Sequence, residues 1–182
     1  MPPRSCAKAK VIGDLVKQNK YDDPDFFAKY AAMPRSVSGL ERAAEWPAFR
    51  SLLPELRGKR VLDLGCGFGW HCRYARGKGA TSVVGVDLSE NMLARAKADT
   101  DDPAIEYRLC AIEDLDFPSC EFDAVISSLA LHYVDVFDVY AGKLVIGSEG
   151  GGAFIGARLL IDHNFSISTF LEKRDLVVRL FN

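Results

Sequence analysis

Five short apolar runs recur along the middle of the chain, and segments with apolar residues at helical spacing separate several of them. The runs lie at residues 61–64, 82–86, 105–109, 123–127 and 153–160. Strands covered by helices on both faces have such continuous apolar runs, because both sides of each strand are buried. Alternation of strands and helices is typical of a parallel sheet. The pattern predicts an α/β fold with a doubly wound, mainly parallel sheet and helices on both faces.

Several predicted helices between these runs have recognisable ends. A helix at residues 69–76 ends where two glycines follow, and Ser89 is a suitable cap for a helix that continues to about residue 98. A further helix is expected from residue 135. These helices supply the crossovers that parallel strands need.

Two more helices are predicted ahead of the sheet. Asp23 is a suitable N-cap and Pro24 suits the first turn, so a helix begins there and ends before Pro34. Ser38 and Glu41 have the spacing of a capping box and predict a second helix that continues to about residue 53. Both helices would form a cap on the sheet.

The chain therefore divides into four segments. They are a flexible leader (1–20), an N-terminal helical cap (21–57), a ligand-binding sheet domain (58–160) and a divergent C-terminal tail (161–182). The leader is basic but lacks the apolar core of a secretory signal, which leaves a disordered leader and a mitochondrial presequence as alternatives.

Composition and charge narrow the expected partners. The 182 residues have a formal net charge of −2, so no basic field points to nucleic acid. No apolar run approaches the roughly 18 residues that a membrane span needs. The five cysteines include no CxxC pair, which favours a reducing, cytoplasmic location. The three histidines share no metal-ligand spacing, so no metal is expected.

The sequence VLDLGCGFGW, at residues 61–70, carries the most specific chemistry. Gly65, Gly67 and Gly69 follow an apolar run directly, and glycines let the backbone N–H groups approach a ligand at the start of a helix. Asp87, in SVVGVDLS, lies twenty residues beyond Gly67, at the end of the next run. This layout is typical of a site for an adenosine-containing cofactor. Trp70 stands where a dinucleotide fingerprint has its third glycine, which argues against an NAD-dependent oxidoreductase.

With these motifs the chain resembles the class I S-adenosylmethionine-dependent methyltransferases, in particular the small bacterial type related to the ubiquinone and menaquinone biosynthesis enzymes. The resemblance covers about residues 21–160 and rests on VLDLGCGFGWHCRYA, VVGVDLSENMLARA, IEDLDF with FDAVISSLALHYV, and KYDDPDFFAKY. It implies a Rossmann-like fold, S-adenosylmethionine as cofactor, S-adenosylhomocysteine as product and a small-molecule methyl acceptor.

The resemblance also implies roles for individual residues. Asp63 would act near the methionine ammonium, the three glycines near the methionine portion, and Asp87 would accept both ribose hydroxyls. Leu88 and Met92 would flank the adenine, with the Ile112 N–H group on a ring nitrogen. The expected cofactor-binding set is Tyr21, Tyr30, Asp63, Gly65, Gly67, Gly69, Asp87, Leu88, Met92, Ile112, Glu113 and Ser127. No catalytic residue is assigned; His132 is a candidate base, and an ordinary packing role is its alternative.

Two departures from the family pattern bear on activity. Relatives commonly have Gly-Asp-Ala-Glu in the adenine loop, where this chain has CAIED at residues 110–114, so Glu113 or Asp114 would replace the missing aspartate and cofactor affinity should be weaker. Residues 161–182 are few for the last two strands of a seven-stranded sheet, so the C-terminal strands are expected to be incomplete. The alternatives are truncation, completion by a partner or in a homodimer, or a natural minimal form. A non-catalytic cofactor-binding module or truncated pseudo-enzyme is the alternative function.

Overall fold

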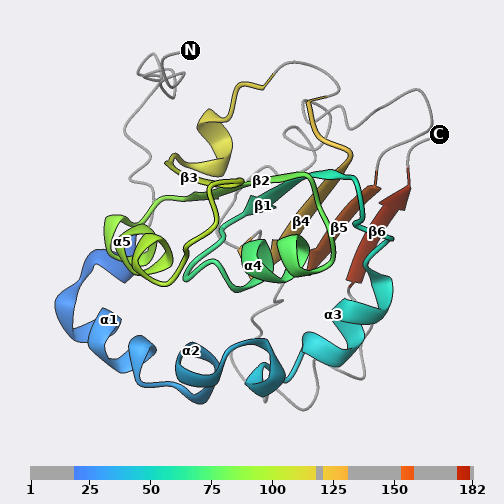
Figure 1. Ribbon diagram of the computed structural model, residues 1–182. Coiled ribbons are helices and arrows are strands. Elements are labelled where there is room, and N and C mark those ends of the chain that lie inside the picture. Colours follow the sequence, from blue (N-terminus) through green and yellow to red (C-terminus); the bar gives the residue numbers. More distant parts are fainter. Residues whose placement is uncertain (1–18, 118–120, 131–152, 158–175, 181–182) are drawn as a thin grey trace.

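A computed structural model describes residues 19–117, 121–130, 153–157 and 176–180 of the chain. Its centre is a six-stranded sheet in the order β3-β2-β1-β4-β5-β6 (Figure 1). The strands are β1 (Arg60–Leu64), β2 (Ser82–Asp87), β3 (Ile105–Leu109), β4 (Ala124–Ser128), β5 (Ala153–Ala157) and β6 (Leu176–Leu180). The first five strands are parallel, and β6 runs antiparallel to β5.

The predicted fold class is confirmed, and all five apolar runs contain strands. The sixth strand, β6, lies in the expected tail, which therefore contributes a strand of its own. The strand order reverses between β1 and β4, because the chain moves outward from β1 to β3 and then returns to the other side of β1. In open α/β sheets a ligand binds beyond the carboxyl ends of the strands at such a switch point.

Several of the predicted helices are present in the structure, and one of them is wrong. The described helices are α1 (Pro24–Ala31), α2 (Pro34–Ser38), α3 (Trp46–Leu52), α4 (Trp70–Gly77) and α5 (Glu90–Ala98), with 3-10 turns η1 (Lys20–Asp22), η2 (Leu40–Arg42) and η3 (Ile112–Asp114). The Asp23 side chain caps α1 by accepting from the Phe26 amide at 2.8 Å, as expected. The Ser89 hydroxyl caps α5 in the same way. The helix expected from residue 135 lies outside the described residues.

The single helix predicted from the Ser38–Glu41 capping box is wrong. Ser38 instead ends α2, and Gly39 follows with a φ of 74°, a conformation that ends a helix. Pro47 then stands in the first turn of α3, where its missing N–H group costs nothing. Two short helices and a 3-10 turn therefore replace one long helix, and Figure 1 shows them as an arc along one side of the sheet.

The core has two halves, one on each face of the sheet. On one face, Trp46 and Phe49 of α3 belong to the same buried cluster as Cys72 of α4 and Val61 and Val83 of the sheet. On the opposite face, strand side chains that alternate with these pack with Ile112, Leu115, Phe117 and Phe122. The helical cap therefore shares one core with the sheet, while the four-segment division of the chain remains a prediction.

Among the helices that the structure describes, none combines the length and the apolar character required to cross a membrane.

We predict that Gly39→Ala lowers the free energy of unfolding by about 1–3 kcal/mol. The new Cβ would lie 2.7 Å from Cζ3 of Trp70, and the backbone would be strained at its positive φ. Urea unfolding monitored by circular dichroism measures the change. Gly77→Ala, where a Cβ meets no atom within 4 Å, is the matched control. Equal stability of the two variants would contradict the prediction.

Candidate functional site

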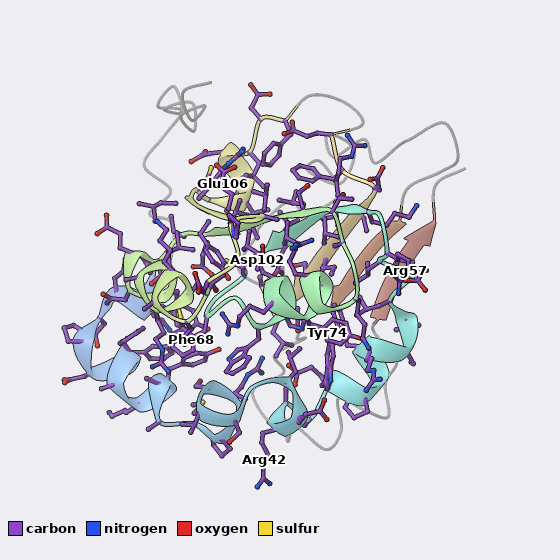
Figure 2. The ribbon with its side chains drawn as sticks, viewed as in Figure 1. Arg42, Arg57, Phe68, Tyr74, Asp102 and Glu106 are labelled. Carbon is purple, nitrogen blue, oxygen red and sulfur yellow. The ribbon has the colours of Figure 1, made fainter. Side chains whose placement is uncertain are left out.

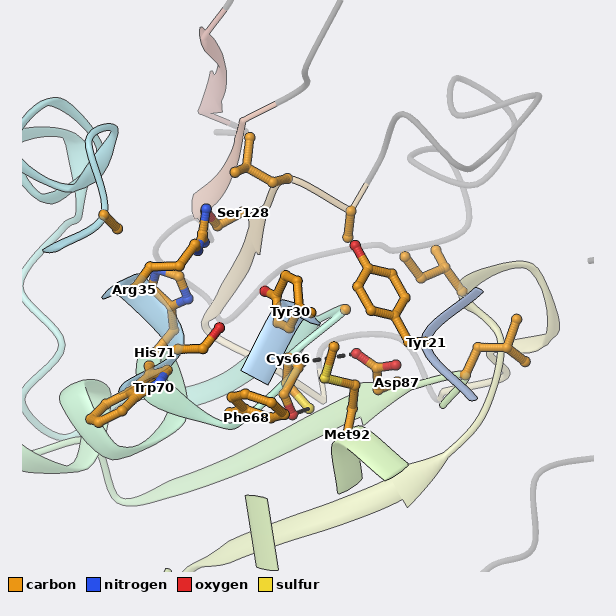
Figure 3. Close-up of a pocket in the computed structure, with 18 of the residues that line it drawn as sticks. Tyr21, Tyr30, Arg35, Cys66, Phe68, Trp70, His71, Asp87, Met92 and Ser128 are labelled. Carbon is orange, nitrogen blue, oxygen red and sulfur yellow. Dashed lines mark hydrogen bonds between the residues drawn. The ribbon is translucent and has the colours of Figure 1, made fainter. Parts of the chain in front are cut away.

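A cavity of about 270 Å³ opens at the carboxyl ends of β1, β2 and β4, under the N-terminal helices. Nine of the twelve residues predicted to bind a cofactor line it: Tyr21, Tyr30, Gly65, Gly67, Asp87, Leu88, Met92, Ile112 and Glu113. They come from four segments that are distant in the sequence, so the fold brings most of the predicted residues together. Figure 3 shows Asp87, Met92 and Tyr21 on one side of the cavity and Arg35, His71 and Trp70 on the other.

The glycine loop joins β1 to α4 at the floor of the cavity. The N–H groups of Gly65 and Cys66 both donate to the Val86 carbonyl at 2.9 Å, which holds the loop against the end of β2. Gly65 has a φ of 70°, and a Cβ on it would overlap the side chain of Ala130. Only glycine therefore lets the loop pass between β2 and Ala130, which lies two residues beyond the end of β4.

Asp87 ends β2 and faces this loop. Its Oδ2 accepts from the Gly67 amide at 2.8 Å, and its Oδ1 accepts from the Ser89 amide at 2.9 Å. Burial raises the pKa of Asp87, and the backbone hydrogen bonds offset only part of that effect. Each carboxylate oxygen has two lone pairs, so both can still accept from a ligand hydroxyl.

Asp63 lies behind the glycine loop and does not line the cavity. It is 1% exposed, and its Oδ2 accepts from the Cys72 thiol at 3.2 Å. Its Oδ1 has no hydrogen-bond partner among the described residues. Burial raises the pKa of Asp63 to about 7. The loop thus has a buried carboxyl group behind it, and the role expected for Asp63 near an ammonium group remains a prediction.

Two further predicted residues also lie away from the cavity. The Ser127 hydroxyl is fully buried and donates to the Leu64 carbonyl at 3.1 Å. The next residue, Ser128, lines the cavity instead, because successive side chains of a strand point to opposite faces. Gly69 begins α4 and packs closely against Tyr107. His132, the candidate base, lies outside the described residues.

The sequence reasoning missed a polar group at the opposite end of the cavity. Arg35 is the one permanently cationic side chain among the described lining residues, and its Nη2 pairs with Glu45 at 2.9 Å. Around it lie three buried polar atoms without partners in the described structure, namely Ser36 Oγ, Trp70 Nε1 and Ser128 Oγ. Buried polar atoms normally have hydrogen-bond partners, so this end can receive a polar ligand group.

His71 adds no positive charge to this end. Burial and the nearby Arg35 lower its pKa to about 3, and its ring packs against Trp46 and Phe49 at 5.5 and 5.4 Å. The cavity therefore has carboxylates at one end, on Asp87 and Glu113, and the guanidinium group of the Arg35–Glu45 ion pair at the other. A ligand that extends between them would place an acidic group near Arg35 and hydroxyl groups near Asp87.

Comparison with known proteins points to one family. Residues 61–142 match the model of a methyltransferase domain. The chain is 48% identical to an S-adenosylmethionine-dependent methyltransferase of Mesorhizobium loti, with a TM-score of 0.61 over 65% of this chain and 55% of that one. It is 37% identical over 127 residues to an uncharacterized protein of Haemophilus influenzae, covering 66% of this chain and 50% of that protein.

The name of a third relative states the biosynthetic pathway to which it belongs. A ubiquinone biosynthesis O-methyltransferase of Bradyrhizobium diazoefficiens is 44% identical over 84 residues, which are 44% of this chain and 32% of that enzyme. The chain thus spans half or less of the length of these two curated relatives.

The raised pKa of Asp63 predicts a pH dependence of stability. The folded pKa of about 7 exceeds the unfolded value of about 3.9, so the contribution of Asp63 is complete below about pH 4 and is lost as the pH rises through about 7. Asp63→Asn does not titrate. Relative to this variant, the wild-type protein should therefore lose stability between these pH values.

Urea unfolding of both proteins at a series of pH values measures this difference. Asp116→Asn, which changes an exposed acid, is the control and should follow the wild-type protein. A constant difference between wild type and Asp63→Asn across the whole range would contradict the assignment.

Proposed function

We propose that this chain, whose residues 61–142 form a class I S-adenosylmethionine-dependent methyltransferase domain, transfers a methyl group to a small molecule at the cavity described above. The observation that carries the proposal is the position of Asp87. Asp87 is the last residue of β2, and its carboxylate accepts a hydrogen bond from the Gly67 amide. It lines one end of the cavity, and Arg35 lines the other end. A nucleoside with an amino acid attached has matching groups at both ends.

The adenosine portion would lie at the acidic end. The Asp87 carboxylate would accept both ribose hydroxyls, each in a charge-assisted hydrogen bond worth roughly 1.5–3 kcal/mol. Leu88 and Met92 would form apolar walls for the adenine, and the Ile112 amide would donate to a ring nitrogen. Glu113, which also lines the cavity, would accept from the adenine amino group in place of the aspartate that relatives have.

The amino acid portion would lie across the glycine loop toward Arg35. The guanidinium group and the unpartnered Ser36 hydroxyl suit a carboxylate, because both can donate hydrogen bonds to it. The buried polar atoms at this end and the bare backbone at Gly67, where a Cβ would meet open space, agree with such a ligand. When bound, S-adenosylmethionine supplies an electrophilic methyl group on a sulfonium that leaves as a thioether.

The protein mainly aligns the two reactants and excludes water. Tyr21 and Tyr30 line the cavity from the N-terminal segment, and their rings lie 5.2 Å apart in an edge-to-face contact. They would cover the reacting centre. His132 is the candidate group to accept the acceptor's proton.

A small-molecule acceptor is supported by the relative in ubiquinone biosynthesis and by the net charge of −2, which gives no basic field for RNA. Radiolabel transfer from methyl-labelled S-adenosylmethionine tests this proposal. Transfer to a small quinol, amine or carboxylic acid supports it, whereas transfer only to RNA overturns the small-molecule acceptor. Binding of the cofactor without transfer to any of them favours the non-catalytic alternative.

We predict that Asp87→Ala raises the dissociation constant for S-adenosylhomocysteine at least about tenfold, the loss of one charged hydrogen bond or more. Titration calorimetry measures it. Asp101→Ala, which removes an exposed acid, should keep the wild-type affinity. An unchanged affinity in Asp87→Ala would remove the ribose assignment.

We predict that Arg35→Gln weakens the binding of S-adenosylhomocysteine about tenfold and leaves that of 5′-methylthioadenosine, which lacks the amino acid portion, unchanged. Arg42→Gln is the control, since Figure 2 shows Arg42 pointing away from the molecule. A thermal melt confirms that loss of the Arg35–Glu45 pair leaves the variant folded. Equal weakening of both ligands would argue against a carboxylate at Arg35.

A further inference from the structure

Asp22, the last residue of η1, joins the N-terminal segment to the start of α5. Its Oδ1 accepts from the Ser89 hydroxyl at 2.5 Å and from the Asn91 amide at 3.1 Å. Its Oδ2 accepts from the Glu90 amide at 3.3 Å. The first amides of a helix have no partner inside the helix, and a negative charge is favourable there. Asp22 therefore caps α5 from a position 67 residues before Ser89.

The carboxylate of Asp22 is stabilised in its charged form. Burial raises the pKa of Asp22, but the hydrogen bonds that it accepts from Ser89, from Asn19 and from the α5 amides outweigh that effect and leave the pKa below its usual value. The cap is thus a charged one, and charge-assisted hydrogen bonds are stronger than neutral ones.

Ser89 connects Asp22 to Asp87. Ser89 is fully buried; its hydroxyl donates to Asp22 and accepts from the Met92 amide at 3.1 Å. Its backbone amide donates to Asp87 at 2.9 Å. Because one buried serine contacts both carboxylates, the position of Asp22 and the orientation of Asp87 are linked.

The residues beside Asp22 face the cavity. Asn19 and Tyr21 both line it. The Asn19 side chain donates to Asp22 at 2.5 Å and to the Leu88 carbonyl at 3.3 Å, and the Asn91 side chain donates to the Tyr21 carbonyl at 3.5 Å. Asp22 is thus the centre of a polar clasp, formed by Asn19, Asp22, Ser89 and Asn91, that holds the N-terminal segment.

Aromatic contacts join the next turn of this segment to the glycine loop. The ring of Tyr21 lies 5.1 Å from Phe26, while Phe27 and Tyr30 contact Phe68 of the glycine loop at 5.9 and 5.7 Å. The Arg95 guanidinium of α5 lies over the ring of Phe68, the residue labelled near α5 in Figure 2, at 5.5 Å from its centroid. These contacts bring the segment close to the loop, and the clasp adds directional hydrogen bonds to them.

We propose that Asp22 is a positioning residue for cofactor binding. By capping α5 it holds Asn19 and Tyr21 over the cavity, and through Ser89 it keeps Asp87 aimed at the ribose position. The nature of the ligand rests on the proposed function, whereas the clasp is a property of the ligand-free protein. Asp22 is not one of the described residues that line the cavity, so it acts through these neighbours.

The test replaces the carboxylate and measures two quantities. In Asp22→Asn an NH2 group takes the place of one oxygen that accepts hydrogen bonds. We expect the amides of Glu90 and Asn91 to exchange at least about tenfold faster in the ligand-free protein, and S-adenosylhomocysteine to bind about fivefold to tenfold more weakly by calorimetry. Asp22→Glu, which keeps the charge, should recover part of both effects. Asp25→Asn, an exposed acid three residues further on, should change neither.

Ser89→Ala extends the test to the connection with Asp87. Asp22 and Ser89 share one hydrogen bond, so their effects overlap. The loss of affinity in the double variant, Asp22→Asn with Ser89→Ala, should therefore be smaller than the product of the losses in the two single variants. Faster exchange with wild-type affinity in Asp22→Asn would overturn the positioning role, and unchanged exchange would overturn the clasp. If the wild-type protein binds no S-adenosylhomocysteine, the proposed function fails, and the exchange measurement still decides whether Asp22 holds the segment.

Discussion

The carboxylate of Asp87 is the interaction on which the geometry of the cavity depends. Its two oxygens accept from Gly67, in the loop that follows β1, and from Ser89, at the start of α5. One carboxylate at the end of β2 therefore connects the glycine loop to the start of α5, in addition to the hydrogen bonds between that loop and the Val86 carbonyl. Burial makes that charge costly, and the backbone amides compensate only part of the cost. A ligand that donates hydroxyl groups would add to this compensation.

Much of the fold could be predicted because its signals are local. Continuous apolar runs identified the strands, and the glycine loop and Asp87 followed them directly, so nine of the twelve expected residues meet at one cavity. The errors have specific physical causes. The capping box at Ser38 failed because Gly39 and Pro47 interrupt any helix there, and Ser127 was placed in the cavity instead of Ser128 because a difference of one residue reverses the face of a strand.

The residues that sequence reasoning missed have partners far away in the chain. Asp22 meets Ser89 across 67 positions, and Arg35 lines one cavity with Trp70 and Ser128, which come from distant parts of the chain. No periodicity or spacing reports such contacts, since each depends on the packing of the whole N-terminal segment. The result is a cavity with carboxylates at one end and a guanidinium group at the other.

The shared core of the cap and the sheet has a consequence for exchanging parts between related proteins. Trp46 and Phe49 are 2% and 0% exposed and pack in the same cluster as the strands. A chimera that imports a foreign N-terminal region to alter selectivity must therefore bring matching bulk at these two positions. Smaller side chains at these positions would leave a void beneath α4. The chimera would then lose the rigidity of its core without gaining a new substrate selectivity.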